Sequence, residues 1–411
     1  MSNSITREKV NISKLQIGMY VCELDRPWLE TPYPLQGFFL ESEDDIQGLL
    51  SYCKFVYIDV HRSTENELHK LNDGLQPQFS NKDQQHIYRV KYEDSQSMEQ
   101  ELPRAKRHFE AMSANTENLI KNLTQGKKLN LVEIKESTKQ MVESVIRNPD
   151  AVLWLMRLKQ NDNYMYQHSL RCSILAIAFG RQLGLTKRHL NNLAIGAALM
   201  DIGKLKLPKT LLNRPGKLLE DEFEMIQDHV RLSLKMISES GHDSKEVTEM
   251  VATHHERMNG KGYPKGLKET EIPLFGRIAA IVDCYDAISS TRAHAAALSS
   301  GEAIKKLYEW RKIDFHPALV EVFIQALGIY PAGSLVELST GEVGVVMSEY
   351  RSRRLRPKIM LILDQRKCLY KEFPTIDLYE VTETEDGQKI HIHQSLEPGS
   401  YGINPSELLL G

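Results

Sequence analysis

The stretch His254-His255-Glu256-Arg257-Met258-Asn259-Gly260-Lys261-Gly262-Tyr263-Pro264 is the most informative part of this sequence. Two adjacent histidines and a carboxylate are followed by a glycine-rich turn that ends in proline. Imidazole and carboxylate groups are common metal ligands, and glycine allows a backbone to approach a bound molecule closely. The stretch therefore predicts a metal site beside a loop that contacts a ligand.

Further candidate ligands lie within about 90 residues upstream and about 30 residues downstream of this stretch, namely His168, Asp201, His229 and Asp283. Asp201 follows the apolar run 193–200, and Asp283 lies inside the apolar stretch that begins at Ile278, so we expect both carboxylates to be buried. A buried charge without a partner is unfavourable. Two buried aspartates and a double histidine in one domain therefore indicate a shared cation.

The types of ligand narrow the choice of metal and reaction. Imidazole and carboxylate groups without thiolate suit Fe, Mn, Zn or Ni. An aspartate that bridges two ions about 3.5–4 Å apart is typical of a hydrolytic site, where a bound water becomes a nucleophile at neutral pH. Lys204 follows Asp201 by three residues and Arg292 follows Asp283 by nine, so either cation is a candidate to neutralise a phosphoryl oxygen.

Composition excludes several other classes. The net charge of −3 gives no general attraction to nucleic acid polymers or anionic membranes. No apolar run approaches the roughly 18 residues that a membrane span requires, and the first residues lack the apolar segment of a signal peptide. The five cysteines are scattered without a CxxC pair, which favours reduced thiols and a cytoplasmic location.

The pattern along the 411 residues predicts a multidomain, mainly α-helical protein. The predicted parts are a small N-terminal α/β or β-rich domain at 1–65, a polar linker at 66–104, connecting helices at 105–149, a helical domain at 150–328 and a small C-terminal β unit at 329–411. In the N-terminal domain we expect strands near 10–12, 19–22 and 55–60, with a short helix at 42–50. In the C-terminal unit we expect strands at 334–338, 343–347 and 359–363.

The helical domain contains clear helix boundaries and two long loops. We expect helices at 164–183, 186–200, 220–238, 244–256, 276–289, 301–311 and 317–327. Gly184 should end the first of these and Thr186 should cap the second. The loops at 203–217 and 257–274 are rich in proline and glycine, and long loops in a compact helical domain are where ligands are usually bound.

Together these motifs resemble the HD-GYP subfamily of the HD phosphohydrolases over about residues 150–328. The residues that carry the resemblance are Asp201-Ile202-Gly203-Lys204, Leu207-Pro208, Arg214-Pro215-Gly216-Lys217-Leu218, His229, His254-His255-Glu256-Arg257, Gly260, Gly262-Tyr263-Pro264, Gly266-Leu267, Ile272-Pro273, Arg277-Ile278, Asp283 and Asp286-Ala287. The N-terminal domain, with Gly18-Met19-Tyr20-Val21, Asp25, Trp28 and Tyr57-Ile58-Asp59, is similar to the small domain that often precedes HD-GYP modules in bacteria.

The resemblance implies a fold, a reaction and a set of site residues. It implies an HD-type helical domain and hydrolysis of cyclic di-GMP to linear pGpG, with GMP as a further product, in bacterial second-messenger signalling. It implies a divalent metal, with Fe or Mn favoured and one or two ions, held by His168, Asp201, His229, His254, His255 and Asp283. Asp201 and Lys204 would be catalytic, and the substrate would be contacted by Lys204, Gly262, Tyr263, Pro264 and Arg292.

Three departures from the family pattern leave alternatives open. The histidine of the His-Asp pair is Met200, Tyr164 stands where members with a third metal carry glutamate, and the segment 293–296 lacks the usual basic residues. Because a thioether is a poor ligand for hard or borderline cations, Met200 weakens one ion position. The first alternative is a degenerate member that binds a cyclic dinucleotide or a partner signalling protein without efficient catalysis. The second is a hydrolase of cyclic GMP-AMP or another nucleotide. A homodimer is left open.

Overall fold

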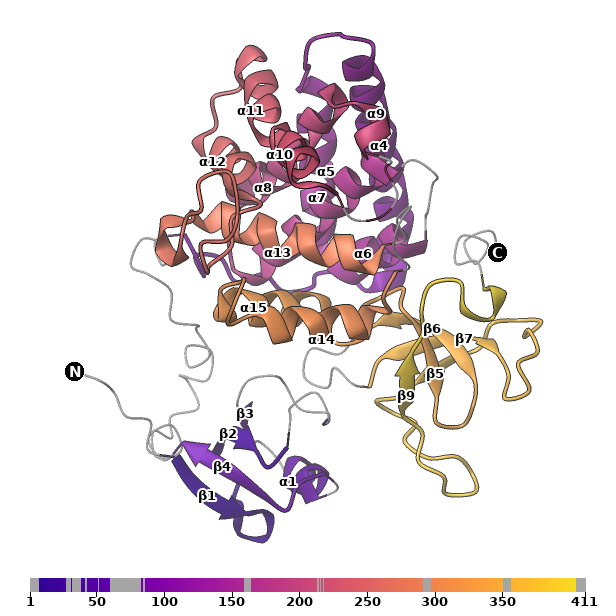
Figure 1. The fold of residues 1–411 in the computed structure, drawn as a ribbon. Helices are drawn as coiled ribbons and strands as arrows, with labels where there is room; N and C mark the ends of the chain where they lie inside the picture. Colours follow the sequence, from indigo (N-terminus) through magenta and orange to yellow (C-terminus); the bar gives the residue numbers. More distant parts are fainter. Residues whose placement is uncertain are drawn as a thin grey trace. The chain divides into compact units, whose positions relative to one another are not determined.

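The computed structural model describes residues 7–26, 31, 38–40, 43–50, 52–59, 83, 86–158, 164–212, 214, 216, 218–290, 297–349 and 356–403. The chain divides into two compact units (Figure 1), one of residues 1–78 with 351–355 and one of residues 79–350 with 356–411.

The N-terminal unit is a small antiparallel sheet with one helix. Its elements are β1 (Arg7–Asn11), β2 (Tyr20–Leu24), β3 (Phe38–Phe39), α1 (Glu43–Leu50) and β4 (Phe55–Asp59), and the strand order is β1-β4-β2-β3. Ile46 and Leu49 of α1 join a core with strand residues that include Val21 and Val56. The predicted small α/β domain is confirmed. Strand β3 was not predicted, because two residues are too few to give a recognisable sequence pattern.

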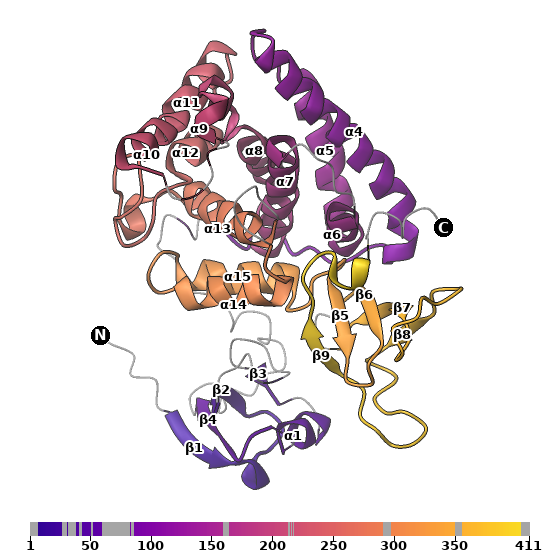
Figure 2. The same ribbon diagram turned by 45° about the vertical axis from the view of Figure 1, so that its right-hand side comes forward.

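The second unit contains the helical domain. Its helices are α4 (Met98–Thr124), α5 (Val132–Arg147), α6 (Pro149–Leu158), α7 (Tyr164–Gln182), α8 (Lys187–Leu199), the 3-10 turn η3 (Ile202–Lys206), α9 (Lys209–Leu212), α10 (Glu220–Gln227), α11 (His229–Glu239), α12 (Lys245–Thr253), the 3-10 turn η4 (Glu269–Glu271), α13 (Leu274–Ser289), α14 (Ser300–Trp310) and α15 (Pro317–Leu327). Figure 2 shows α7 and α8 between α4 to α6 on one side and α10 to α13 on the other.

Helix α7 forms the centre of this domain and is buried on nearly every side. It packs against α8, α13 and α15, and its polar residues His168 and Arg171 face Asp286 of α13. Gly184 follows α7 with φ of 66°, a left-handed conformation that glycine adopts without strain. Thr186 then accepts a hydrogen bond from the His189 backbone N–H and caps α8. Both predicted boundaries are confirmed.

The predicted single helix at 220–238 is wrong. Two helices, α10 and α11, meet at Asp228. The imidazole Nδ1 of His229 lies 2.6 Å from the carbonyl oxygen of Ile226. A side chain that takes a backbone acceptor in this way disturbs the regular helical ladder. His229 therefore opens α11 rather than lying in the middle of a longer helix.

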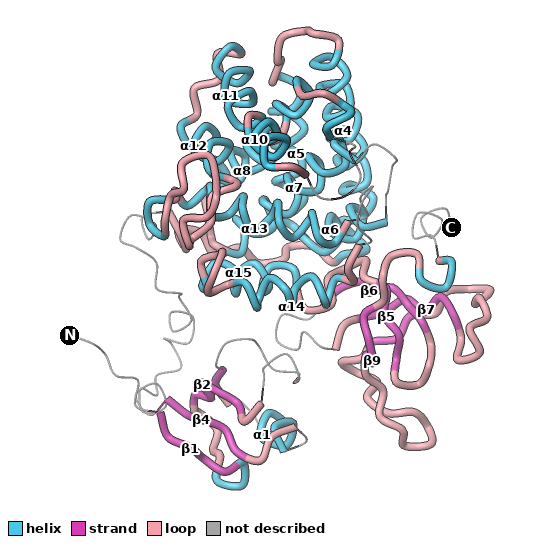
Figure 3. Tube along the Cα trace, in the orientation of Figure 1, coloured by secondary structure: helices cyan, strands magenta, loops and turns pink. Residues whose placement is uncertain are grey.

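The C-terminal part is a five-stranded antiparallel sheet (Figure 3). Its strands are β5 (Leu335–Leu338), β6 (Val343–Ser348), β7 (Lys358–Leu363), β8 (Thr375–Asp377) and β9 (Ile392–Ser395), in the order β8-β7-β6-β5-β9. Val336, Val346 and Ile359 lie in its core. The predicted small β unit is confirmed, and its two edge strands are additions to the three expected. Among the residues that the structure describes, no helix has the length and apolar character needed to cross a bilayer.

Candidate metal centre

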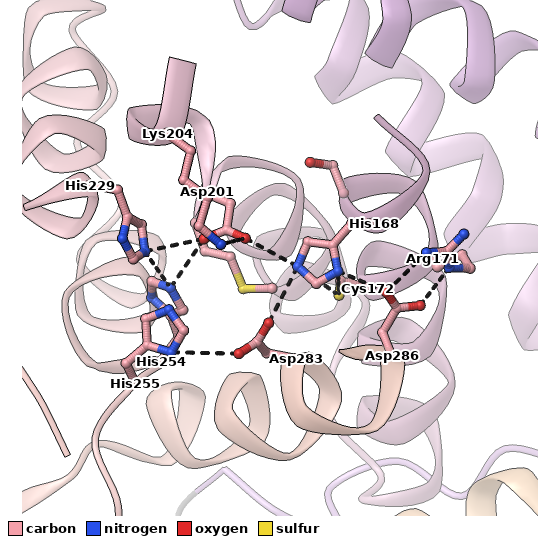
Figure 4. Close-up of polar contacts among 12 residues, drawn as sticks. His168, Arg171, Cys172, Asp201, Lys204, His229, His254, His255, Asp283 and Asp286 are labelled. Atoms are coloured by element: carbon pink, nitrogen blue, oxygen red, sulfur yellow. Dashed lines mark hydrogen bonds and ion pairs between the residues drawn. The ribbon is translucent and has the colours of Figure 1, made fainter. Parts of the chain in front are cut away.

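The six predicted ligands come from five segments and converge on one buried cluster (Figure 4). They are His168 in α7, Asp201 after α8, His229 at the start of α11, His254 and His255 after α12, and Asp283 in α13. All are buried except His255, which is partly buried. The helical domain therefore brings together the groups that the sequence singled out.

Local packing explains how Asp201 reaches His229. The Gly203 N–H donates to Ser233 Oγ at 2.8 Å, and that hydroxyl donates to the Met200 carbonyl at 3.0 Å. A Cβ on Gly203 would collide with the His229 carbonyl oxygen. Glycine is thus required where the turn after α8 meets the first turn of α11. This close approach fixes Asp201 beside His229.

On one side of the cluster, a carboxylate oxygen and two imidazole nitrogens lie in contact with one another. Asp201 Oδ1 lies 3.2 Å from His229 Nε2 and 3.6 Å from His254 Nε2, and these two nitrogens are 3.3 Å apart. The Nδ1 atoms of the two rings lie 2.6 Å and 2.8 Å from the carbonyl oxygens of Ile226 and Val251. Because a carbonyl only accepts, we assign the proton of each ring to Nδ1, which leaves both Nε2 lone pairs facing the carboxylate.

This arrangement fits a cation. Lone pairs and a carboxylate oxygen in such contact repel one another unless a positive charge lies among them. Among the buried polar atoms of the described residues, Asp201 Oδ1 and His255 Nε2 lack a hydrogen-bond partner. Ligand atoms of Asp201, His229, His254 and His255 all lie within 4.8 Å of one another. Three imidazoles and one carboxylate are a suitable donor set for a divalent transition metal.

On the other side, His168 faces two carboxylates. Its Nε2 lies 3.2 Å from Asp201 Oδ2 and 3.3 Å from Asp283 Oδ1, while its Nδ1 lies 2.7 Å from Asp286 Oδ2. Arg171 in turn donates to both Asp286 oxygens, at 2.5 Å and 3.1 Å. We therefore assign the His168 proton to Nδ1, which donates to Asp286 and leaves Nε2 available to a metal.

Asp201 belongs to both sides. Its Oδ1 faces His229 and His254, and its Oδ2 faces His168. Asp283 has a similar arrangement, because its Oδ2 lies 3.6 Å from His255 Nδ1. The geometry thus offers two neighbouring ion positions with Asp201 between them. Lys204 Nζ also lies 2.6 Å from Asp201 Oδ2, where the ammonium offsets part of the negative charge.

The charges of the cluster follow from these contacts. Burial raises the pKa of Asp201, but the Lys204 ammonium outweighs this effect and holds that pKa well below its usual range. Burial also raises the pKa of Asp286, but Arg171 and His168 more than offset this effect and lower that pKa to about 2. Burial, reinforced by the neighbouring His254, lowers the pKa of His255. The ionised carboxylates and the neutral His255 are the forms that bind metal.

The Gly-Tyr-Pro loop covers one edge of the cluster. The Tyr263 ring stacks on the His255 ring with centroids 4.5 Å apart and an interplanar angle of 29°. A Cβ on Gly262 would run into the backbone of Glu256 and Arg257. The buried Glu256 carboxylate accepts hydrogen bonds from the backbone N–H groups of Lys265 and Leu267, at 2.8 Å and 2.9 Å. Pro264 follows Tyr263 through a cis peptide bond.

The other residues singled out in the sequence are only partly covered by the described structure. Lys204 lies at the cluster, whereas Arg292, the segment 293–296 and the Tyr164 side chain lie outside the described residues. Met200 is fully buried directly before Asp201. Sequence reasoning assigned no role to Asp286 or Arg171. The Glu256 carboxylate, which the sequence offered as a possible metal ligand, instead accepts backbone hydrogen bonds in the loop. Asp286 lies one helical turn beyond Asp283, and this spacing was a usable signal.

Comparison with known proteins identifies the domains. The HD domain family matches residues 155–319, a domain of unknown function (DUF3391) matches residues 7–134, and the KOW domain associated with the HD domain matches residues 335–384. The helical fold and the family match therefore define an HD-domain protein, and the histidine-aspartate cluster is its candidate metal centre.

Named relatives identify the family more closely. The chain is 30% identical over 385 residues to the cyclic di-GMP phosphodiesterase PA4108 of Pseudomonas aeruginosa, covering 92% of this chain and 90% of that protein. It is 36% identical over 156 residues to the cyclic di-GMP phosphodiesterase response regulator RpfG of Xanthomonas campestris pv. campestris, covering 38% and 41% of the two chains. It is also 29% identical over 196 residues to the 3'3'-cGAMP-specific phosphodiesterase 2 of Vibrio cholerae, covering 47% and 36%. The chain belongs to the HD-GYP family of HD-domain phosphodiesterases.

Proposed function

We propose that this protein is a metal-dependent phosphodiesterase that hydrolyses cyclic di-GMP to linear pGpG, with GMP as a further product. The observation that carries this proposal is the contact among Asp201 Oδ1, His229 Nε2 and His254 Nε2, in which three acceptors face one another without a proton between them. Relatives named as cyclic di-GMP phosphodiesterases support the choice of substrate.

The cofactor in this proposal is one or two divalent ions, with Fe or Mn favoured by the imidazole and carboxylate ligands. The residues that would hold them are His168, Asp201, His229, His254, His255 and Asp283. Such ions polarise a phosphoryl oxygen and lower the pKa of water.

The chain's own side chains complete the site. The Lys204 side chain is 25% exposed and its ammonium contacts Asp201 Oδ2, so it is within reach of both the cluster and an entering phosphate. Asp286 and Arg171 hold His168 in the tautomer that a metal requires. The Tyr263 pKa is raised by burial and by Asp201 and Asp283, so its hydroxyl stays protonated. Together with Gly262 and Pro264, Tyr263 would form the substrate wall, and Arg292 stays a proposed phosphate contact.

Met200 favours a second candidate function, which is binding of a cyclic dinucleotide, or of a partner signalling protein, without efficient turnover. The His168 side offers one imidazole and two carboxylates within the described cluster, whereas the His229 side offers three imidazoles. The His168 position should therefore hold its ion more weakly. A relative named as cGAMP-specific makes cyclic GMP-AMP the alternative substrate. A cyclic dinucleotide substrate implies action in the bacterial cytoplasm, and a homodimer is compatible with the proposal.

Metal analysis and turnover by purified protein test this function. Wild type should contain divalent metal, be stabilised against heat by added Mn²⁺ and release pGpG from cyclic di-GMP. Asp201→Ala should lose the metal, the thermal shift and the turnover. Asp243→Ala, which removes an exposed carboxylate in the turn after α11, is the matched control and should behave as wild type. Turnover by Asp201→Ala at the wild-type rate would contradict the proposal, and tight binding without product would favour the second function.

A further inference from the structure

Helix α10 exposes apolar side chains next to the metal centre. Leu219 at its N-terminal boundary is 57% exposed, and Phe223 is 45% exposed. No side chain of α10, all of which the structure describes, is fully buried. A short helix that presents large apolar groups to solvent beside a reaction centre is typical of a ligand-binding surface.

Ring contacts connect Phe223 to the metal ligands. The Phe223 ring meets the Tyr263 ring edge to face, with centroids 5.8 Å apart and an interplanar angle of 85°. Tyr263 stacks in turn on His255 at 4.5 Å, and His255 Nδ1 lies 3.6 Å from Asp283 Oδ2. A series of aromatic rings therefore runs from the surface of α10 to the cluster, so that the Phe223 surface is continuous with the reaction site.

Cationic side chains lie on the segment between the cluster and α10. Lys204 is partly exposed at Asp201, and Lys206 and Lys209 are exposed just beyond it. An aromatic surface that continues to a cationic group, here Lys204 at the cluster, is a combination that binds nucleotides, since the bases stack and the phosphates are neutralised. In a cyclic dinucleotide whose phosphate lies at the cluster, a sugar connects that phosphate to the base, and the Tyr263 and Phe223 rings provide an aromatic surface beside the cluster for such a base.

We propose that Phe223, with Leu219 one helical turn before it, forms the stacking surface for a purine base of the substrate and contributes to substrate specificity. This inference rests on the proposed cyclic dinucleotide hydrolysis and adds a binding residue to it. Met225 follows Phe223 by two positions and therefore projects from roughly the opposite side of α10, about 200° around the helix. At 49% exposure it is also apolar and similarly exposed, so it provides a control on the same helix but outside the proposed surface.

Steady-state kinetics with the metal-loaded full chain test the role of Phe223. Phe223→Ala should raise KM for cyclic di-GMP by about tenfold or more, in the range of measured base-stacking effects, with kcat changed less than about twofold and metal content unchanged. Phe223→Trp should retain a KM near that of wild type because it keeps an aromatic face. Met225→Ala should leave both constants unchanged.

Inhibition by products separates base binding from phosphate binding. GMP should inhibit wild type more strongly than ribose 5-phosphate, and Phe223→Ala should weaken inhibition by GMP while leaving inhibition by ribose 5-phosphate unchanged. If wild type turns over cyclic di-GMP and Phe223→Ala has the same KM and the same inhibition by GMP, the base surface is overturned while the proposed function stands. If wild type neither binds nor hydrolyses a cyclic dinucleotide, the proposed function fails and this inference fails with it. A Phe223 variant that changed only the capture of a protein partner would also overturn the base assignment.

Discussion

His168 Nδ1 and Asp286 Oδ2 lie 2.7 Å apart, joining helices α7 and α13 at the metal cluster. Asp286 accepts the Nδ1 proton, so the opposite nitrogen of the ring, which faces Asp201 and Asp283, is the one available to a metal. Carboxylates that hold a metal-binding histidine in this way fix its orientation and increase its basicity. Two hydrogen bonds from Arg171 keep Asp286 itself in position.

Asp286→Asn should therefore weaken metal binding without removing a proposed ligand. The amide keeps the shape of the side chain but loses the charge that favours the Nδ1-protonated ring and pairs with Arg171. Changes of this kind typically reduce metal affinity or activity by about 10–100-fold. Titration of the metal-free protein with Mn²⁺, followed by thermal shift, measures the effect. Asp243→Asn serves as the exposed control, and equal Mn²⁺ affinity in both variants would show that Asp286 does not orient the ring.

Met200→His should raise metal content or turnover. The Met200 side chain is fully buried directly before Asp201, and an imidazole there would add a nitrogen ligand on the side of the cluster that has only one. The imidazole also has to fit a packed core, so folding should be checked by circular dichroism. Metal stoichiometry and the rate with cyclic di-GMP are the readouts, with the exposed Met225→His as control. If a folded variant gains neither metal nor rate, Met200 does not limit the second ion position.

Acid should destabilise the helical domain through His189, a buried histidine of α8 away from the proposed ligands. Burial lowers its pKa to about 4, helped by the neighbouring Arg188. Since the folded-state pKa lies below the unfolded value of about 6.5, the unfolded chain takes up the proton first. The contribution of neutral His189 is thus complete above about pH 6.5 and is lost as the pH falls through about 4.

Urea unfolding of wild type and His189→Gln between pH 7 and pH 4, with chelator in every sample, measures this contribution. The free energy of unfolding of wild type should fall by on the order of 2 kcal/mol more than that of the variant over this range. Parallel pH profiles for the two proteins would show that His189 is not held neutral by the fold.

The helical domain was largely predictable because its helices carry their own boundary signals. Thr186 and Gly184 mark where α8 begins and α7 ends. The apolar stretch around Asp283 predicts a buried helix. The edge strands β8 and β9, of three and four residues, are too short to show alternation. The break at Asp228 could not be predicted, because it depends on a side chain bonding to the backbone behind it.

The proposed metal ligands could be predicted from the sequence, but the residues that hold those ligands and the neighbouring loop in position could not. His254, His255 and the buried aspartates are unusual enough in an apolar context to be noticed individually. Arg171 looks like any surface cation in sequence, and its role appears only when α13 brings Asp286 alongside α7. Glu256 was read as part of a motif, whereas its contacts with Lys265 and Leu267 require the loop to be folded.

The loop that follows the double histidine is anchored at several points, since Asn259 Nδ2 also donates to Asp314 Oδ1 at 2.8 Å and the Arg257 guanidinium lies over the Phe315 ring at 5.3 Å. Both Glu256 oxygens also accept hydrogen bonds from this loop. The loop, which forms a wall of the site, is therefore ordered in the absence of a nucleotide. A rigid wall loses little conformational entropy on binding, so the contacts that we propose between Tyr263 and a nucleotide would carry little ordering cost. We therefore expect recognition on this side by a pre-organised surface rather than by a closing flap.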